Sequence, residues 1–174
     1  MDVTRRATIG LAVLAFLIPA TVYLITLNPT VPFWDAGEFI AVSYILGIPH
    51  PPGTPLYVLL GRVATLIPWA TVAQRVNGLS ALASALAVLL TYLTALRLIR
   101  AAQGRGPGAT RAPEGDAVRA AREPREEWMA QAGAVMTALM LAFSDNFWEN
   151  AIEAEVYSLM SLAQILVFWL GLRW

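Results

Sequence analysis

Two short parts of this chain carry a concentration of carboxylates. Residues 28–75 and 144–155 are bordered by long apolar runs, and an ionisable group beside a membrane is a functional candidate because its entry into the bilayer is costly. A carboxylate in such a place can accept a proton from a hydroxyl group or hold a divalent cation. Half of the twelve acidic residues lie in these two parts: Asp35, Glu38, Asp145, Glu149, Glu153 and Glu155.

The first carboxylate pair lies in the sequence Phe33–Phe39 (FWDAGEF). Asp35 and Glu38 are three residues apart, so they share one face of a helix. They could form a catalytic pair, or Asp35 could be the N-cap of a helix whose capping box is closed by Glu38. The spacing alone favours the capping box, with Trp34 as an interfacial aromatic residue.

A proline-rich turn follows at His50–Pro55 (HPPGTP). A residue before proline is pushed out of the helical conformation, so we expect a rigid, extended turn between two short helices. Such a turn would fix His50 and aim the next helix, which carries Arg62. Two interpretations of this arginine stay open: its side chain extends to lipid headgroups, or its planar guanidinium binds a phosphate.

The second acidic segment runs from Asn146 to Tyr157 (NFWENAIEAEVY). Glu149, Glu153 and Tyr157 follow one another at intervals of four, which predicts one polar stripe on a continuous helix, with Glu155 on another face. A solvated acidic loop and a functional site are equally good interpretations of this segment.

The composition predicts the kind of scaffold that must position these groups. Hydrophobic residues make up 57% of the 174 residues and the mean hydropathy is +0.59, values that are unusual for a soluble domain of this size. A helix rises about 1.5 Å per residue, so about 20 residues cross the hydrocarbon core. The sequence therefore predicts an all-α, polytopic transmembrane domain over residues 1–174, with about four spans at 7–27, 76–96, 128–143 and 156–172.

The proline-rich part, residues 28–75, is the predicted outer loop. Its apolar stretch Pro55–Trp69 carries Arg62 and would reach only about 22 Å as a helix, which is short for a membrane span. We therefore expect short interfacial helices in this loop.

The distribution of arginine predicts the orientation in the membrane. Seven arginines lie between Arg97 and Arg125, and an excess of basic residues in a short loop marks the cytoplasmic side. We therefore expect the loop 97–127 and both ends of the chain to be cytoplasmic. The two acidic segments would then lie outside a multi-pass protein of the cell inner membrane or plasma membrane.

The residue composition also excludes several kinds of site. The chain has no cysteine and a single histidine, His50, which excludes disulfides, thiolate metal sites and multi-histidine metal sites within the chain. No tract resembles a nucleic-acid-binding patch. A transporter component, with outer acids that attract cations, would carry charges midway through its spans, and these spans lack them. A non-catalytic membrane scaffold is a second alternative to an enzyme.

Five motifs, taken in order, resemble one family: PTVPFWDAGEFIAVSY, HPPGTPLYVLLGR, RVN, FWENAIEAEVYSL and FWLGLRW. It is a bacterial membrane family formerly of unknown function, similar to membrane glycosyltransferases of the protein O-mannosyltransferase type in the GT-C superfamily. The resemblance covers nearly the whole chain apart from the arginine-rich loop. Because such enzymes have many more spans, it implies that this chain is the N-terminal part of a GT-C fold.

The resemblance also implies an activity and a set of site residues. A sugar such as mannose would pass from a polyprenyl-phosphate donor to an acceptor hydroxyl, on a protein or glycan, at the outer face of the lipid bilayer. Asp35 matches an acid of the first outer loop that acts in such active sites, and Glu38 lies beside it. Neither a nucleic acid nor a metal is required, although outer carboxylates could hold a divalent cation such as magnesium. The residues expected to bind substrate are His50, Arg62, Glu153, Glu155, Tyr157 and Trp34.

Overall fold

The computed structural model describes residues 3–104 and 116–174, and all regular structure within these residues is helical. This confirms the all-α prediction. The helices are α1 (Val3–Ile25), α2 (Ala36–Ile45), α3 (Pro55–Thr65), α4 (Val72–Ala102), α5 (Asp116–Ala142), α6 (Asp145–Ala151) and α7 (Val156–Arg173).

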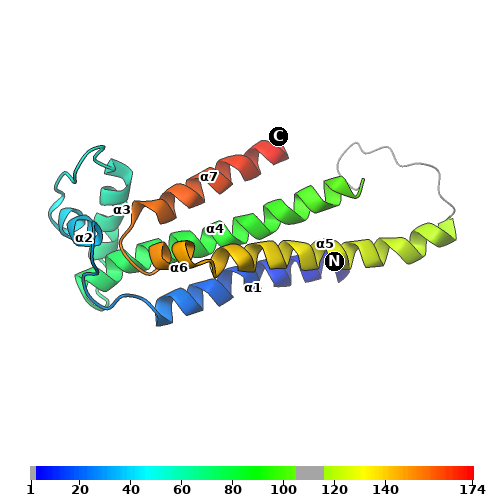
Figure 1. Ribbon diagram of the computed structural model, residues 1–174, viewed down its shortest axis with the longest axis horizontal. Coiled ribbons are helices and arrows are strands. Elements are labelled where there is room, and N and C mark those ends of the chain that lie inside the picture. Colours follow the sequence, from blue (N-terminus) through cyan, green and yellow to red (C-terminus); the bar gives the residue numbers. More distant parts are fainter. Residues whose placement is uncertain (1–2, 105–115) are drawn as a thin grey trace.

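Four long helices, α1, α4, α5 and α7, form an elongated bundle in which the chain direction alternates (Figure 1). Helix α4 contacts each of the other three. Small residues allow this close packing: α4 buries Ala81 and Ala85, and α5 buries an alanine at every fourth position. The α5 series is Ala130, Ala134, Ala138 and Ala142.

Three of the helices, α1, α4 and α7, are long and apolar enough to cross a membrane. This supports the interpretation of the chain as a membrane protein. Residues 128–142 belong to α5, which packs beside α4, but that helix also contains a charged N-terminal half. The span predicted at 128–143 therefore stays a prediction.

Part of the segment predicted as the loop 97–127 is helical. Helix α4 continues to Ala102 and α5 already begins at Asp116. The sequence of this part of α5 is rich in alanine, arginine and glutamate, which are strong helix formers. Residues 105–115 lie outside the described residues.

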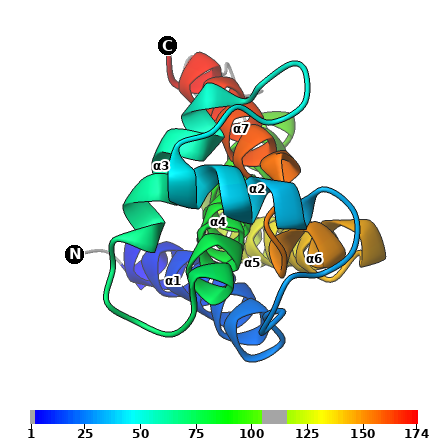
Figure 2. The same ribbon diagram turned by 90° about the vertical axis from the view of Figure 1, so that its left-hand side faces the viewer.

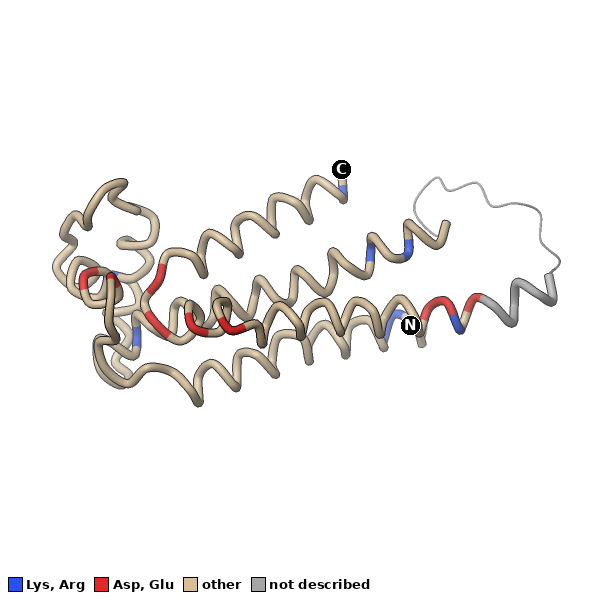
Figure 3. Tube along the Cα trace, in the orientation of Figure 1, with Lys and Arg blue, Asp and Glu red and all other residues tan. Residues whose placement is uncertain are grey.

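Helices α2, α3 and α6 gather at one end of the bundle, where α2 and α3 cross in front of α4 (Figures 1 and 2). The prediction of short helices in residues 28–75 is thus confirmed. The acidic residues of 35–38 and 145–155 lie toward this end, whereas the arginines of α1, α7 and the last turns of α4 lie toward the other (Figure 3). The fold therefore brings the two acidic segments of the sequence together.

Candidate active site

The first turn of α2 and the turn at 47–54 place Glu38 and His50 in direct contact. Glu38 accepts two hydrogen bonds from His50, from the backbone N–H to Oε1 at 2.7 Å and between Oε2 and Nδ1 at 2.6 Å. Gly53, at φ 90°, closes the turn by donating its N–H to the His50 carbonyl at 3.0 Å. Glycine suits this position because a side chain is strained at positive φ.

The predicted capping box is wrong. Asp35 is the N-cap of α2, but its side chain makes no capping hydrogen bond, and its backbone is in the right-handed helical region rather than extended. Glu38 bonds His50 instead of reaching back to the N-cap N–H. A partner twelve residues away thus replaces the local partner that the spacing suggested.

Asp35 lies on the other side of the imidazole ring. Its Oδ2 is 3.9 Å from His50 Nε2, so the two ring nitrogens face two different carboxylates. The hydrogen bond to Glu38 is the main cause that raises the pKa of His50, and the same bond lowers the pKa of Glu38. The imidazolium form is therefore favoured between Asp35 and Glu38.

Glu155 brings a third carboxylate from the other acidic segment. It precedes α7 and is held at its backbone by Ser80 of α4, whose hydroxyl accepts from the Glu155 N–H at 3.2 Å. The residue is 7% exposed. Burial, followed by the nearby charges of Glu153 and Asp35, raises the pKa of Glu155 to about 7. This carboxyl group therefore retains a proton near neutral pH for an appreciable part of the time.

Asp35, His50 and Glu155 line one cavity of about 480 Å³ between the α2–α3 end and α7, and Glu38 adjoins it through its contact with His50. Its polar and ionisable members are Asp35, His50, Thr54, Tyr57, Glu155 and Tyr157. Its other walls are mainly apolar and are formed by Phe39 of α2, Leu56 of α3, and Val156, Leu159, Met160 and Ala163 of α7. The cavity is thus amphipathic, with acids on one part of its wall and a membrane-type helix on another.

The cavity excludes three residues that the sequence suggested for substrate binding. Trp34 is 91% exposed, Glu153 is half-buried, and neither lines the cavity. Arg62 donates from Nη1 to the Tyr44 carbonyl at 2.6 Å, close to the C-terminal end of α2. Asp35, at the N-terminal end of α2, precedes Tyr44 by nine residues, which corresponds to about 13 Å along the helix axis. The structure gathers Asp35, Glu38, His50, Glu155 and Tyr157, and leaves Trp34, Glu153 and Arg62 outside.

The predicted stripe of Glu149, Glu153 and Tyr157 is also wrong. Helix α6 ends at Ala151 and α7 begins at Val156, so no continuous helix aligns these side chains. Glu155, expected on another face, is the acid of this segment that reaches the cavity.

Asp35, Glu38 and His50 also have the geometry of a cation site. Each offers one ligand atom, and these atoms lie within 4.8 Å of one another. Two carboxylates and an imidazole suit a divalent cation such as Mn²⁺, and carboxylates alone suit Mg²⁺. Coordination by His50 Nδ1 would require the hydrogen bond to Glu38 to break, so a metal and the observed Glu38–His50 contact exclude each other.

The sequence of this chain is similar to one family of known proteins. Residues 35–174 match the family described as "Protein O-mannosyl-transferase TMEM260 N-terminal domain". The chain belongs to this family. It is 32% identical over 170 residues to protein O-mannosyl-transferase TMEM260 of Mus musculus, covering 97% of this chain and 20% of that protein. It is 27% identical over 172 residues to the tmem260 protein O-mannosyl-transferase of Dictyostelium discoideum, covering 97% and 18%.

The chain thus spans about a fifth of the length of the curated relatives that it matches. No solved structure matches it. The matched region starts at Asp35 and includes every residue that lines the cavity, whereas α1 precedes it. The resemblance to O-mannosyltransferases expected from the five motifs is confirmed.

Sequence reasoning missed the polar residues that hold this TMEM260-type domain together beneath the site. Asn77 of α4 is fully buried and donates to the carbonyls of Asn28 at 2.8 Å and Thr30 at 3.3 Å. Ser80, one turn later, contacts the Tyr57 hydroxyl at 3.2 Å as well as the Glu155 backbone. The sequence could have indicated these contacts, because polar side chains within an apolar span, such as Asn77 and Ser80, need hydrogen-bond partners inside the protein.

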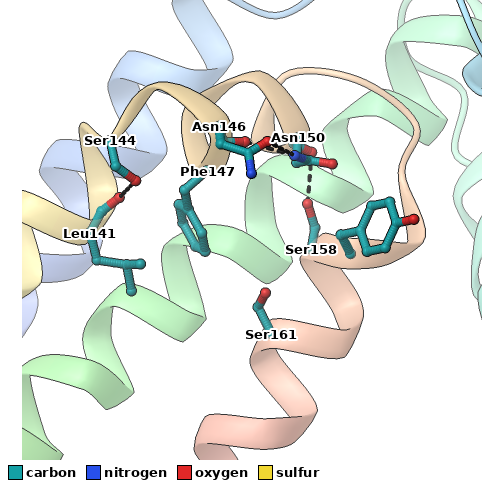
Figure 4. Close-up of a pocket in the computed structure, with 8 residues that line it drawn as sticks. Leu141, Ser144, Asn146, Phe147, Asn150, Ser158 and Ser161 are labelled. Atoms are coloured by element: carbon teal, nitrogen blue, oxygen red, sulfur yellow. Dashed lines mark hydrogen bonds between the residues drawn. The ribbon is translucent and has the colours of Figure 1, made fainter.

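A second cavity of about 410 Å³ lies where α5, α6 and α7 meet (Figure 4). Six of its eight lining residues carry a hydroxyl or amide group, and the other two are Leu141 and Phe147. Ser158 donates to the Asn150 carbonyl at 2.7 Å, and Asn150 donates to the Asn146 carbonyl at 2.7 Å. Tyr157 lines both cavities, so the two spaces share one wall.

Proposed function

We propose that this chain provides the catalytic acid–base groups of a membrane O-mannosyltransferase. The enzyme would transfer a sugar from a polyprenyl-phosphate donor to an acceptor hydroxyl at the outer face of the membrane. The observation that carries the proposal is the single amphipathic cavity, which joins Asp35, His50 and Glu155 to apolar residues of α7. Such a cavity suits a donor with a polar sugar phosphate and an apolar chain, and the names of the two relatives agree with it.

The reaction needs one new bond, one broken bond and one proton transfer. The acceptor oxygen attacks the anomeric carbon, the bond from that carbon to the phosphate oxygen breaks, and polyprenyl phosphate departs. The acceptor proton passes to a carboxylate, which acts as general base. Phosphate is already a good leaving group and requires no proton.

Asp35 is the carboxylate best placed for the role of base. Glu38 is engaged by two hydrogen bonds from His50, and Glu155 is only 7% exposed, whereas the side chain of Asp35 is 58% exposed and can be reached by an acceptor. Among the described residues, the ionic neighbour of the Asp35 carboxylate is His50 Nε2 at 3.9 Å, which leaves room for an acceptor hydroxyl.

The remaining groups reduce the repulsion that an anionic donor would meet. A protonated His50 carries a positive charge between Asp35 and Glu38, and a protonated Glu155 removes one negative charge from the cavity wall. A phosphate that enters therefore faces a weaker negative field than three ionised acids would produce.

Asp35→Asn in the full-length protein tests this proposal. We expect sugar transfer from a polyprenyl-phosphate mannose donor to fall at least about a hundredfold, because general base catalysis is typically worth that much. The Asp35 side chain makes no capping hydrogen bond and asparagine has nearly the same size, so the melting temperature should be nearly unchanged. Asp145→Asn, which removes an exposed acid outside the cavity, is the matched control. Transfer by Asp35→Asn at the normal rate would remove Asp35 from the mechanism.

A further inference from the structure

A cavity of about 700 Å³ lies between the first turns of α1 and the last turns of α4 and α7, at the end of the bundle opposite the acidic site. Residues from four helices line it, and the ones that matter here are Arg5 of α1, Arg100 of α4, Glu127 of α5, and Trp169 and Arg173 of α7. Its size is within the range of cavities that bind small ligands. Nothing in the proposed sugar transfer uses this end of the molecule.

The charges around this cavity do not balance. Arg100 forms an ion pair with Glu127, and its Nε donates to Glu127 Oε2 at 3.2 Å. Within the residues that the structure describes, neither Arg5 nor Arg173 has a carboxylate within 4.0 Å; Arg173 lies over the Trp169 ring at 5.7 Å. Among the described residues that line the cavity, three arginines thus accompany one acid, which gives this lining an excess of two positive charges.

The walls behind these arginines are fixed by buried polar contacts. Gln131 of α5 is 2% exposed, donates to Thr8 Oγ1 at 2.7 Å and donates to Glu127 Oε1 at 2.8 Å. Arg100 also donates to Thr8 Oγ1, at 3.2 Å. Helices α1, α4 and α5 are therefore joined in one network beneath the cavity, and Arg100 is held in a defined orientation.

Simpler roles explain only some of these arginines. Arg100 and Arg173 lie in the last turns of α4 and α7, where a positive charge is favoured by the helix dipole. Arg5 lies in the first turn of α1, where the same dipole disfavours it. Basic residues before a first span can set the orientation of a protein in the membrane, and that role would apply equally to Arg5 and Arg6. Of these two residues, however, only Arg5 lines the cavity.

The arginine and tryptophan side chains that line this cavity suit a phosphate-bearing lipid. Guanidinium groups bind phosphate oxygens through paired N–H donors, and a tryptophan such as Trp169 is favoured at the level of lipid headgroups. The cavity borders α1 and α7, two helices that are long and apolar enough to cross a membrane. We propose that this cavity binds the phosphate headgroup of an anionic phospholipid, in the leaflet that the arginine distribution predicts to be cytoplasmic.

Lipid binding to the full-length protein, purified in detergent, tests this proposal. Native mass spectrometry would compare phosphatidylglycerol with phosphatidylcholine, for the unchanged protein and for the double variant Arg5→Gln/Arg173→Gln. We expect selective binding of phosphatidylglycerol, weakened roughly thirtyfold in the double variant. The control variant Arg6→Gln/Arg97→Gln removes the same charge from residues that do not line the cavity, and we expect it to change binding less than about twofold.

Three outcomes would overturn the proposal. Equal losses in both double variants would show diffuse surface attraction rather than a site. Equal binding of the two lipids would show no recognition of anionic headgroups. Competition by inorganic phosphate as strong as that by phosphatidylglycerol would show a site for a free anion. If the double variant does not fold, Arg173→Gln alone, on an exposed residue at the end of α7, still decides the question against Arg97→Gln.

Discussion

At the residue scale, the most informative contact is the one between Glu38 and His50. Each side chain stabilises the charged form of the other, so the pair is strongest between the lowered pKa of Glu38 and the raised pKa of His50. The stability that His50 contributes is fully present below its unfolded pKa and is lost as the pH rises through its folded pKa. The stability that Glu38 contributes is lost as the pH falls through its own lowered pKa.

The variant Glu38→Gln should lower the pKa of His50. A neutral amide can still accept a hydrogen bond, but it no longer supplies the negative charge and strong acceptor that favour imidazolium. His50 is the sole histidine of the sequence, so one imidazole NMR signal followed against pH measures this pKa directly. Glu149→Gln, which removes an exposed acid outside the cavity, is the control. An unchanged His50 pKa in Glu38→Gln would contradict the described contact.

This pair also shows where residue-scale reasoning from sequence stops. The acids at 35, 38 and 155 and the histidine at 50 were all identified as candidates, because their types are rare beside apolar spans. Their partners were not, since Glu38 bonds a residue twelve positions away and Ser80 holds Glu155 across 75 positions. Such partners depend on how helices meet, and local spacing does not contain that information.

At the scale of the elements, prolines predicted the short helices well, but charge patterns predicted helix ends poorly. Pro55 sits at the first position of α3, as its fixed φ and missing N–H favour. The interruption between α6 and α7 was missed because residues 152–155 have an ordinary helical composition. Tertiary packing overrides the helical preference of these residues. Ala154 is fully buried, and the Glu155 N–H donates to the Ser80 hydroxyl instead of to a carbonyl of its own helix.

The crossing of α2 and α3 depends on Gly61. A Cβ atom at this position would lie 2.2 Å from Ser43 Oγ and 2.8 Å from Ser43 Cβ, so the two helices would have to separate. We expect Gly61→Ala to lower the free energy of unfolding by roughly 1–3 kcal/mol, as overpacking of a core typically does. A lower melting temperature, followed by intrinsic fluorescence in detergent, would measure the effect.

Two further variants make the Gly61 test specific. Gly10→Ala in α1 adds the same methyl group where nothing lies within 4 Å, and it should be neutral or slightly stabilising. Ser43→Gly removes the atoms that clash, so it should restore part of the stability when combined with Gly61→Ala. A Gly61→Ala protein that melts like the unchanged one would show that α2 and α3 do not approach this closely.

At the scale of the whole molecule, the bundle separates two kinds of chemistry. The acids of the two acidic segments lie toward the end of the bundle that carries α2 and α3, and the arginines of α1, α7 and the last turns of α4 lie toward the other end (Figure 3). Three of those arginines line the second charged cavity. The alternating directions of α1, α4, α5 and α7 agree with four crossings of a membrane. Three of these helices, α1, α4 and α7, are long and apolar enough to cross it. Composition and arginine counts could predict this polarity from sequence because they need no knowledge of side-chain contacts.

The orientation of the bundle can be tested directly because the sequence contains no cysteine. Ile48, in the loop after α2, is 89% exposed, and Ala101, in the last turns of α4, is exposed at the opposite end. If basic residues mark the cytoplasmic side, Ile48→Cys should react with a membrane-impermeant maleimide in intact cells, and Ala101→Cys should react only after the cells are permeabilised. Labelling after permeabilisation shows that both thiols are accessible. The reverse pattern in intact cells would place the arginines outside, and the carboxylate cavity would then open on the cytoplasmic side of the membrane.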